Sequence, residues 1–329
     1  MFADVKILLL VFNLGAAADV PFYKGVLYPW AVRERQFCFN DTLCPQDVTY
    51  TWDWFFNTIR AHGVKRFLFG GFSIVESKVT KDPPSYPQWN KRVFANFKQK
   101  VSSVGGSIWL ELGEYFNNEK FDESVFRQSA KQFIKDYSVD GFLFNVDMPS
   151  KAEAAYKVLS TVKSLGKTAI LQYWPGFEET VKKSGLGAIA DYTVIYLSPY
   201  FGKSLAKTFN TNAFAIRKIR TAMNAGANAR NIILRIPLIA RADYATSDVG
   251  YASVLLDMHA DPKGNGSRLY PPAGAYYFFS QPRAVEKVDL VRKMSLGGIM
   301  IDPAYSLCTD MYPWDKRSIF HALAQAVKA

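Results

Sequence analysis

The stretch that decides the fold covers residues 139–149 and reads Val139-Asp140-Gly141-Phe142-Leu143-Phe144-Asn145-Val146-Asp147-Met148-Pro149. It opens with an Asp-Gly pair, continues as a short apolar run, and ends in a carboxylate followed by Met-Pro. Aromatic and β-branched residues over this length, stopped by a Pro, predict a buried strand. The carboxyl end of a parallel strand covered on both faces is where chemistry takes place. Asp147 is therefore a candidate acid, and the alternative is a turn residue that simply ends the strand.

Segments typical of strands and helices alternate along the rest of the chain. The sequence predicts further strands at residues 25–30, 66–72, 107–112, 168–173, 191–197, 232–239, 275–279 and 298–301. It predicts helices at residues 48–62, 91–104, 123–137, 151–165, 213–225 and 281–294. Residues 241–272 carry turn signals and predict an elaborated loop with a short helix. About eight strand–helix alternations indicate one α/β domain, a (β/α)8 TIM barrel.

A doubly wound sheet is the alternative fold. It is disfavoured because no Gly-rich phosphate-binding fingerprint follows a predicted strand, and neither Gly70-Gly71 nor Gly297-Gly298 has that pattern.

Composition limits the classes of protein and partner. The 329 residues are 49% hydrophobic and 21% charged, so a large core is expected and a disordered chain is not. The net charge is +11, but the basic residues are scattered along predicted helices, which favours solvated helix faces over a nucleic-acid surface. Three Cys and three His lack metal-ligand spacing, so no metal and no cofactor are expected.

The first 18 residues have the pattern of a signal peptide. Lys6 precedes an apolar run at residues 7–14, and Ala16-Ala17-Ala18 supplies a small-residue cleavage site, whereas a first barrel strand is the alternative. The mature domain would be residues 19–329. No later segment is long and apolar enough to span a membrane. The pattern predicts that the protein is secreted. It gives no information on the oligomeric state.

Sequons and cysteines fit the same localisation. Asn40-Asp41-Thr42 and Asn265-Gly266-Ser267 are potential N-glycosylation sites. Cys38 and Cys44 flank a short loop and could form a disulfide. Cys308 would then be a third cysteine outside that pair.

The decisive stretch resembles the signature of glycoside hydrolase family 18, the chitinases. The fourth strand of that family reads Asp-Gly-x-Asp-x-Asp-x-Glu, which aligns with residues 140–147. Residues 108–115 resemble the family's third strand, residues 191–202 its sixth strand, and residues 280–301 its last helix and eighth strand. The resemblance covers most of the predicted mature chain and implies a TIM barrel.

The resemblance also implies a chemistry that this chain has lost in part. The family hydrolyses β-1,4-linked N-acetylglucosamine and uses the substrate's own N-acetyl group as nucleophile. Its acid Glu falls on Asp147, and its inner Asp residues fall on Leu143 and Asn145, while Asp140 and Gly141 are unchanged. Asp147, Asn145 and Asp140 are thus the candidate catalytic positions. An acid shortened by one methylene and two lost charges imply weak or absent hydrolysis.

Other residues at predicted strand ends are candidates for ligand contact. The sixth-strand Met-x-Tyr-Asp of the family becomes Tyr196-Leu197-Ser198-Pro199, and its eighth-strand Trp becomes Asp302. Acids near the barrel mouth would accept hydrogen bonds from sugar hydroxyls, and crowding could raise the pKa of one of them; the alternative is that each pairs with a base and holds a loop. Exposed aromatic rings there suit stacking on sugars. The candidates are Trp30, Glu111, Glu114, Tyr115, Trp174, Ser198, Tyr200 and Asp302.

Three hypotheses remain open at this point. The first is a secreted chitinase-like protein that binds an N-acetylglucosamine-containing glycan in the barrel mouth without efficient hydrolysis. The second is a weak or altered hydrolase of such glycans, with Asp147 as the general acid. The third is a protein-interaction scaffold that binds no sugar.

Overall fold

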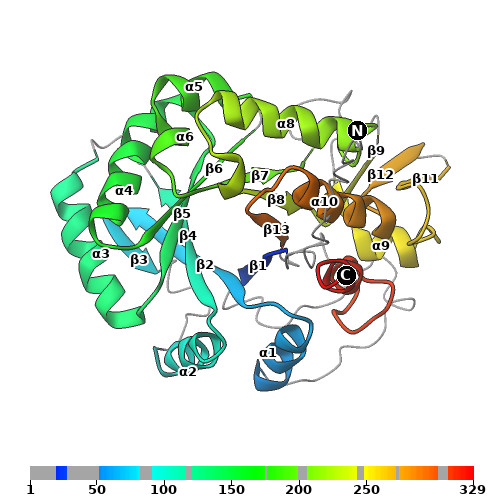
Figure 1. Ribbon diagram of the computed structural model, residues 1–329, viewed down its shortest axis with the longest axis horizontal. Coiled ribbons are helices and arrows are strands. Elements are labelled where there is room, and N and C mark those ends of the chain that lie inside the picture. The colour runs from blue at the N-terminus through cyan, green and yellow to red at the C-terminus, as the bar shows by residue number, and fades with distance from the viewer. Residues whose placement is uncertain are drawn as a thin grey trace, which may run out of the picture.

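Eight parallel strands form a closed barrel in this computed structural model (Figure 1). The structure describes residues 20–27, 52–81, 91–115, 121–174, 176–198, 206–242, 248–271, 274–302 and 310–329. The barrel order is β1-β13-β8-β7-β6-β5-β4-β2, and pairing of β1 with β2 closes it. The strands are β1 (Phe22–Leu27), β2 (Arg66–Val75), β4 (Ser107–Tyr115), β5 (Gly141–Val146), β6 (Thr168–Tyr173), β7 (Tyr192–Tyr196), β8 (Ile232–Ile236) and β13 (Gly298–Ile301). The predicted (β/α)8 TIM barrel is confirmed.

Helices follow the strands and cover the outside of the barrel (Figure 1). Asp122 caps the longest of those described by accepting hydrogen bonds from the backbone N–H groups of Ser124 and Val125. Its buried face repeats at helical spacing with Phe126, Ala130 and Phe133. The helices are α1 (Trp52–Ala61), α2 (Lys91–Ser102), α3 (Glu123–Tyr137), α4 (Ala152–Ser164), α5 (Glu178–Lys183), α6 (Leu186–Ile189), α8 (Asn212–Asn224), α10 (Gln281–Lys293) and α11 (Ile319–Ala326), with short 3-10 turns η1 (Pro149–Lys151) and η2 (Ala229–Asn231).

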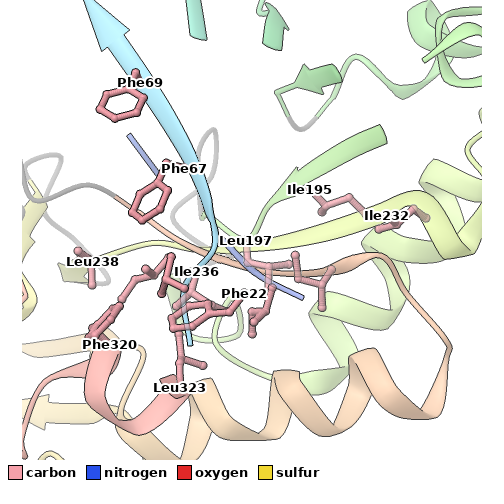
Figure 2. Packing of buried hydrophobic residues seen from close by; sticks show 14 of the residues in the cluster. Phe22, Phe67, Phe69, Ile195, Leu197, Ile232, Ile236, Leu238, Phe320 and Leu323 are labelled. Atoms are coloured by element: carbon pink, nitrogen blue, oxygen red, sulfur yellow. The ribbon is translucent and has the colours of Figure 1, made fainter. Parts of the chain in front are cut away.

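The core between strands and helices is aliphatic and aromatic. Figure 2 shows Phe320 and Leu323 of α11 beside Phe22 and Ile236 of the barrel. The rings of Phe320 and Phe22 stack with centroids 5.4 Å apart. The C-terminal helix therefore anchors the first barrel strand.

The inside of the barrel starts with two apolar layers. One buried residue from each barrel strand contributes, as expected when alternate strands supply the layers. The eight residues are Tyr23, Leu68, Trp109, Leu143, Ile170, Val194, Ile233 and Met300. The lower barrel is consequently filled, and any site must lie beyond these layers, toward the carboxyl ends of the strands.

The structure divides one predicted strand and places another outside the barrel. The apolar run 232–239 is split at Pro237, because a proline has no N–H with which to continue the ladder. Its second half becomes β9 (Ile239–Ala242), and the strand predicted at 275–279 is β12 (Ala275–Phe278); both belong to a separate antiparallel sheet.

Part of the region predicted as a loop is ordered into the same sheet. That sheet has the order β10-β9-β12-β11, with β10 (Asp248–Gly250) and β11 (Ser267–Leu269), and α9 (Tyr251–Leu256) follows β10. It lies at one side of the barrel, away from α3 and α4 (Figure 1). A further strand, β3 (Lys78–Lys81), pairs antiparallel with the end of β2.

Candidate functional site

The level of the barrel above the apolar layers is polar. Side chains alternate along a strand, so positions two residues beyond the apolar layers face the same interior. On β4, β5, β6, β7 and β8 and directly after β13, these positions are, in that order, Glu111, Asn145, Gln172, Tyr196, Arg235 and Asp302. On β1 the position is Gly25, whose missing Cβ would lie 3.0 Å from the sulfur of Met300. The sequence thus places a set of hydrogen-bonding groups directly over an apolar floor.

Arg235 is the centre of this polar layer. Its Nε donates to Asp302 Oδ1 over 2.5 Å, and its Nη1 donates to Gln172 Oε1 over 2.7 Å. Burial alone would lower the pKa of Arg235, but the carboxylates of Asp302 and Glu111 raise it above the usual value, so the guanidinium stays charged. The Tyr196 ring lies under the guanidinium at 5.1 Å, and its hydroxyl donates to Asp302 Oδ2 over 2.7 Å. Asp302 is therefore fully engaged by protein donors.

Glu111 is bound much less completely. Its Oε1 lies 3.9 Å from Arg235 Nη1, beyond hydrogen-bond distance. Its Oε2 is buried and has no hydrogen-bond partner among the described residues. Burial raises the pKa of Glu111, Arg235 counters this, and the nearby Asp302 charge adds to the rise. Glu111, one of the mouth acids expected from the sequence, thus has a raised pKa.

Asp147, the position of the family's acid, lies directly after β5 and forms an ion pair. Lys151 Nζ is 2.7 Å from Asp147 Oδ1, one helical turn further along the chain. The 3-10 turn η1, which starts at Pro149, places the lysine there. The carboxyl group at the acid position is thus engaged by a neighbouring lysine.

The two inner positions of the motif carry no charge. Leu143 is fully buried in the apolar barrel layer. Asn145 faces the polar layer, where its Oδ1 is 3.5 Å from Gln172 Nε2. An amide there can position a ligand, but it cannot stabilise a cationic intermediate as a carboxylate does.

Asp140 lies at the opposite end of β5, roughly 20 Å from Asp147 at the rise of an extended strand. It accepts a hydrogen bond from the Ile108 backbone N–H over 2.7 Å and forms an ion pair with Lys98. A Cβ added to the adjacent Gly141 would lie 2.6 Å from the Thr168 carbonyl oxygen. The unchanged Asp-Gly pair therefore joins β5 to its neighbouring strands, far from the mouth.

The remaining candidates fall into two groups. Ser198 follows β7 and is fully buried, and its Oγ has no hydrogen-bond partner among the described residues. Trp174 follows β6, is half-buried, and donates its backbone N–H to Val146 over 3.1 Å. Trp30 and Tyr200 lie outside the described residues, and of Glu114 and Tyr115 the structure describes only the backbone within β4.

The structure therefore assembles some predicted residues and separates others. Glu111 and Asp302 share Arg235, whereas Asp147 belongs to its own pair with Lys151. The alternative that an acid pairs with a base holds for Asp302 and Asp147, whereas Glu111 has only the longer 3.9 Å contact with Arg235.

Sequence reasoning missed Arg235, Gln172 and Tyr196. A signal was present, because Arg235 is a lone charge within the apolar run Ile-Ile-Leu-Arg-Ile, and Gln172 follows Ala-Ile-Leu in the same way. A polar residue at an inward position of a buried strand needs a partner, and here these residues partner one another.

Two further observations concern the described part of the chain. It contains no group of three or more His, Cys, Asp or Glu side chains arranged to hold a metal ion. Within it, no helix has both the length and the apolar character needed to cross a bilayer.

Comparisons with known proteins bear on the fold. The sequence matches no known family profile. A glycoside hydrolase family 18 N-acetylglucosaminidase from Paenibacillus barengoltzii superposes with a TM-score of 0.63 at 10% identity, covering 93% of this chain and 99% of that one. A family 18 chitinase from Cycas revoluta, solved in complex with (GlcNAc)3, gives 0.58 at 11% identity, covering 93% and 98%.

A multi-modular chitinase, ChiW from Paenibacillus sp. str. FPU-7, gives a TM-score of 0.64 at 14% identity. The match covers 94% of this chain and 33% of that enzyme, so this chain spans about a third of its length. Identities this low show a shared fold and leave the activity open. The predicted resemblance to family 18 is confirmed for the fold.

Proposed function

We propose that this chain binds an N-acetylglucosamine-containing glycan at the carboxyl ends of its barrel strands and does not hydrolyse it efficiently. The observation that carries the proposal is the 2.7 Å ion pair between Asp147 and Lys151 at the position of the family's acid. A general acid must hold a proton within reach of the leaving oxygen, and this carboxylate is held by an ammonium instead.

The neighbouring positions support impaired hydrolysis. The substrate-assisted reaction needs a carboxylate beside the acetamido group, and positions 143 and 145 are Leu and Asn. A chitinase-like barrel without these charges retains a polar mouth above an apolar floor, which suits binding of a sugar. Solved structures of this fold include a chitinase bound to (GlcNAc)3, which is why chitooligosaccharides are the first ligands to test.

The test combines turnover with binding. Release of the fluorophore from a fluorogenic chitooligosaccharide is measured for the wild type and for Asp147→Asn between about pH 4 and 8, a range that covers carboxylate titration. Calorimetry with unlabelled chitotriose then measures affinity. The matched control is Asp136→Asn, which alters an ion pair with Lys91 on the surface of α3.

We expect no turnover in any of the three proteins and similar sugar affinity in all of them. Turnover in the wild type that is lost only in Asp147→Asn would make this chain a hydrolase with a shortened acid. Absence of both turnover and sugar binding would overturn the proposal and leave the scaffold hypothesis.

We further propose that the chain enters the secretory pathway. The support is the leader-like pattern of residues 1–18 and the position of Asn265, which is exposed in a turn before β11. Its Oδ1 accepts hydrogen bonds from Ser267 N and Oγ. N-terminal sequencing and deglycosylation of Asn265→Gln and Asn40→Gln variants from a eukaryotic host test this; an uncleaved and unglycosylated product would contradict it.

A further inference from the structure

The Glu111 carboxyl group has no polar register partner on either adjacent strand. In the β4–β5 ladder Glu111 is the register partner of Leu143, a residue of the apolar layer. On the other side the register between β2 and β4 shifts between Phe69 and Phe72, so that Gly70-Gly71 lies opposite Glu111. This is a bulge, and Gly71 has a φ of +91°, which a residue with a side chain rarely adopts.

The register partners of Glu111 therefore offer its carboxyl group no polar side chain. Its side chain is 18% exposed, and Oε2 itself is buried without a partner among the described residues. Arg235 does not satisfy it, because the short hydrogen bonds of that guanidinium go to Asp302 and Gln172. A buried acceptor without a donor is costly, and such groups in folded proteins serve as ligand sites or strain reservoirs.

Register also connects Glu111 with the missing part of the motif. Leu143 occupies the position of one of the two inner aspartates in the family signature, and Glu111 lies on the adjacent strand, about 4.8 Å away in backbone spacing. Where the family has an aspartate on this strand, the present chain has Leu143 on β5 and the Glu111 carboxyl group on the adjacent strand β4.

A second unsatisfied group lies in the barrel interior. Ser198 follows β7 by two residues, is fully buried, and has no partner for its Oγ among the described residues. Two buried groups without partners, on strands separated by β5 and β6, indicate a site built for a polar ligand.

We infer that Glu111 is the ligand-recognising residue of the barrel mouth and that its carboxylate accepts a hydrogen bond from a sugar hydroxyl or acetamido N–H. The inference rests on the proposed function, because it assumes that the mouth takes a glycan. It assigns recognition to β4 rather than to the motif strand β5. Gly70 and Gly71 keep the strand beside Glu111 free of side chains.

The acceptor role fixes the sign of the pH dependence. A donor from the ligand favours the ionised carboxylate, so binding releases a proton at pH values near the folded-state pKa, and affinity rises with pH. The described charged groups that face Glu111 are Arg235 of β8 and Asp302 after β13. Burial raises the pKa of Glu111, which moves this titration to higher pH than for an exposed glutamate.

The experiment is calorimetric titration of chitotriose into the wild type, Glu111→Gln and Glu111→Ala between about pH 4.5 and 7, in two buffers of different ionisation enthalpy. The control is Glu153→Gln, which removes an exposed carboxylate of α4 that pairs with Lys157. Circular dichroism and thermal unfolding check that each variant folds. Glu111→Gln keeps the volume of the side chain if the alanine variant does not fold.

We expect Glu111→Ala to weaken binding roughly tenfold or more, as for loss of a hydrogen bond to a charged group. The buffer-dependent heat of the wild type should vanish in both Glu111 variants and persist in Glu153→Gln. Unchanged affinity and unchanged buffer dependence in the Glu111 variants would overturn the inference and leave the proposed function standing. Affinity that falls with rising pH would also overturn the acceptor role. A wild type that binds no chitotriose would overturn both.

Discussion

Arg235 on β8 and Asp302 after β13 are joined by a 2.5 Å hydrogen bond inside the barrel, where their side chains are 7% and 5% exposed. The pair spans neighbouring strands and connects, through Gln172 and Tyr196, to two more. A charge pair at this depth stabilises little relative to apolar residues, but removal of one partner leaves a buried charge uncompensated.

Arg235→Met should therefore lower the free energy of unfolding by about 3 to 5 kcal/mol, because Asp302 and Glu111 lose their cation. Urea denaturation followed by circular dichroism measures this. Arg317→Met, which removes a half-exposed partner of Asp315, serves as control and should cost less than about 1 kcal/mol. Equal effects of the two substitutions would contradict a special role for the interior network.

Glu111→Gln should make the protein more stable at pH 7. Burial raises the folded-state pKa of Glu111, so the unfolded chain loses this proton at lower pH than the folded chain. The stability of the wild type then falls as the pH rises from about 4.5 through the folded-state pKa. Urea midpoints at pH 4 and pH 7 should show a gain for the variant only at pH 7. A variant that is less stable than the wild type at pH 7 would show that Arg235 outweighs the cost of burial.

Lys287 should make folding stability increase at mildly alkaline pH. This lysine is fully buried in α10, where its Nζ donates to the Asn210 and Arg283 carbonyl oxygens, and burial lowers its pKa to about 8. Between that value and the ordinary 10.5 the unfolded state binds more protons, so stability rises with pH. From pH 7 to pH 9.5 the rise should be about 2 kcal/mol.

Denaturation of Lys287→Met over the same range should lack that rise, while Lys157→Met on the surface of α4 should keep it. The upper limit of the range avoids tyrosine ionisation, which would act in the opposite direction because burial raises the pKa of Tyr23, Tyr173 and Tyr251. A flat wild-type profile would contradict the shifted pKa of Lys287.

Asp140→Asn should affect folding and leave sugar affinity unchanged. The substitution weakens the ion pair with Lys98 and the hydrogen bond from Ile108 N at the start of β5, and we expect a loss of about 1.5 to 3 kcal/mol. Thermal unfolding and chitotriose calorimetry, performed on the same sample, separate the two effects. A loss of affinity in a fully folded variant would place Asp140 in the binding site despite its distance.

Local signals explain where the sequence predicted the fold well. The helix Glu123–Tyr137 was predicted at its observed bounds because Asp122 caps it and its apolar residues repeat at helical spacing. The strands Thr168–Tyr173 and Gly298–Ile301 are short runs bounded by glycine or polar residues, and they too were predicted at their observed bounds. The run 232–239 failed because an apolar stretch carries no period, although Pro237 marked the break.

The site was predicted less well because it depends on a local turn and on contacts between distant strands. Asp147 was recognised by its place in a motif, but its pair with Lys151 depends on the turn at Pro149. Glu111 was one acid among several, and nothing local shows that its neighbours would be Leu143 and a glycine bulge. Arg235 lies 67 positions from Asp302, a separation at which sequence spacing holds no information on pairing.

The Asp-Gly pair at the start of β5 has a consequence for how such chains are recognised. Its carboxylate and its missing side chain join β5 to the neighbouring strands, whereas residues 143, 145 and 147 are the positions to which the resemblance assigns the chemistry. The signature thus has two separate parts, one that concerns strand packing and one that the resemblance links to catalysis. The presence of Asp140 and Gly141 is therefore explained by strand packing, and it carries no argument for or against turnover.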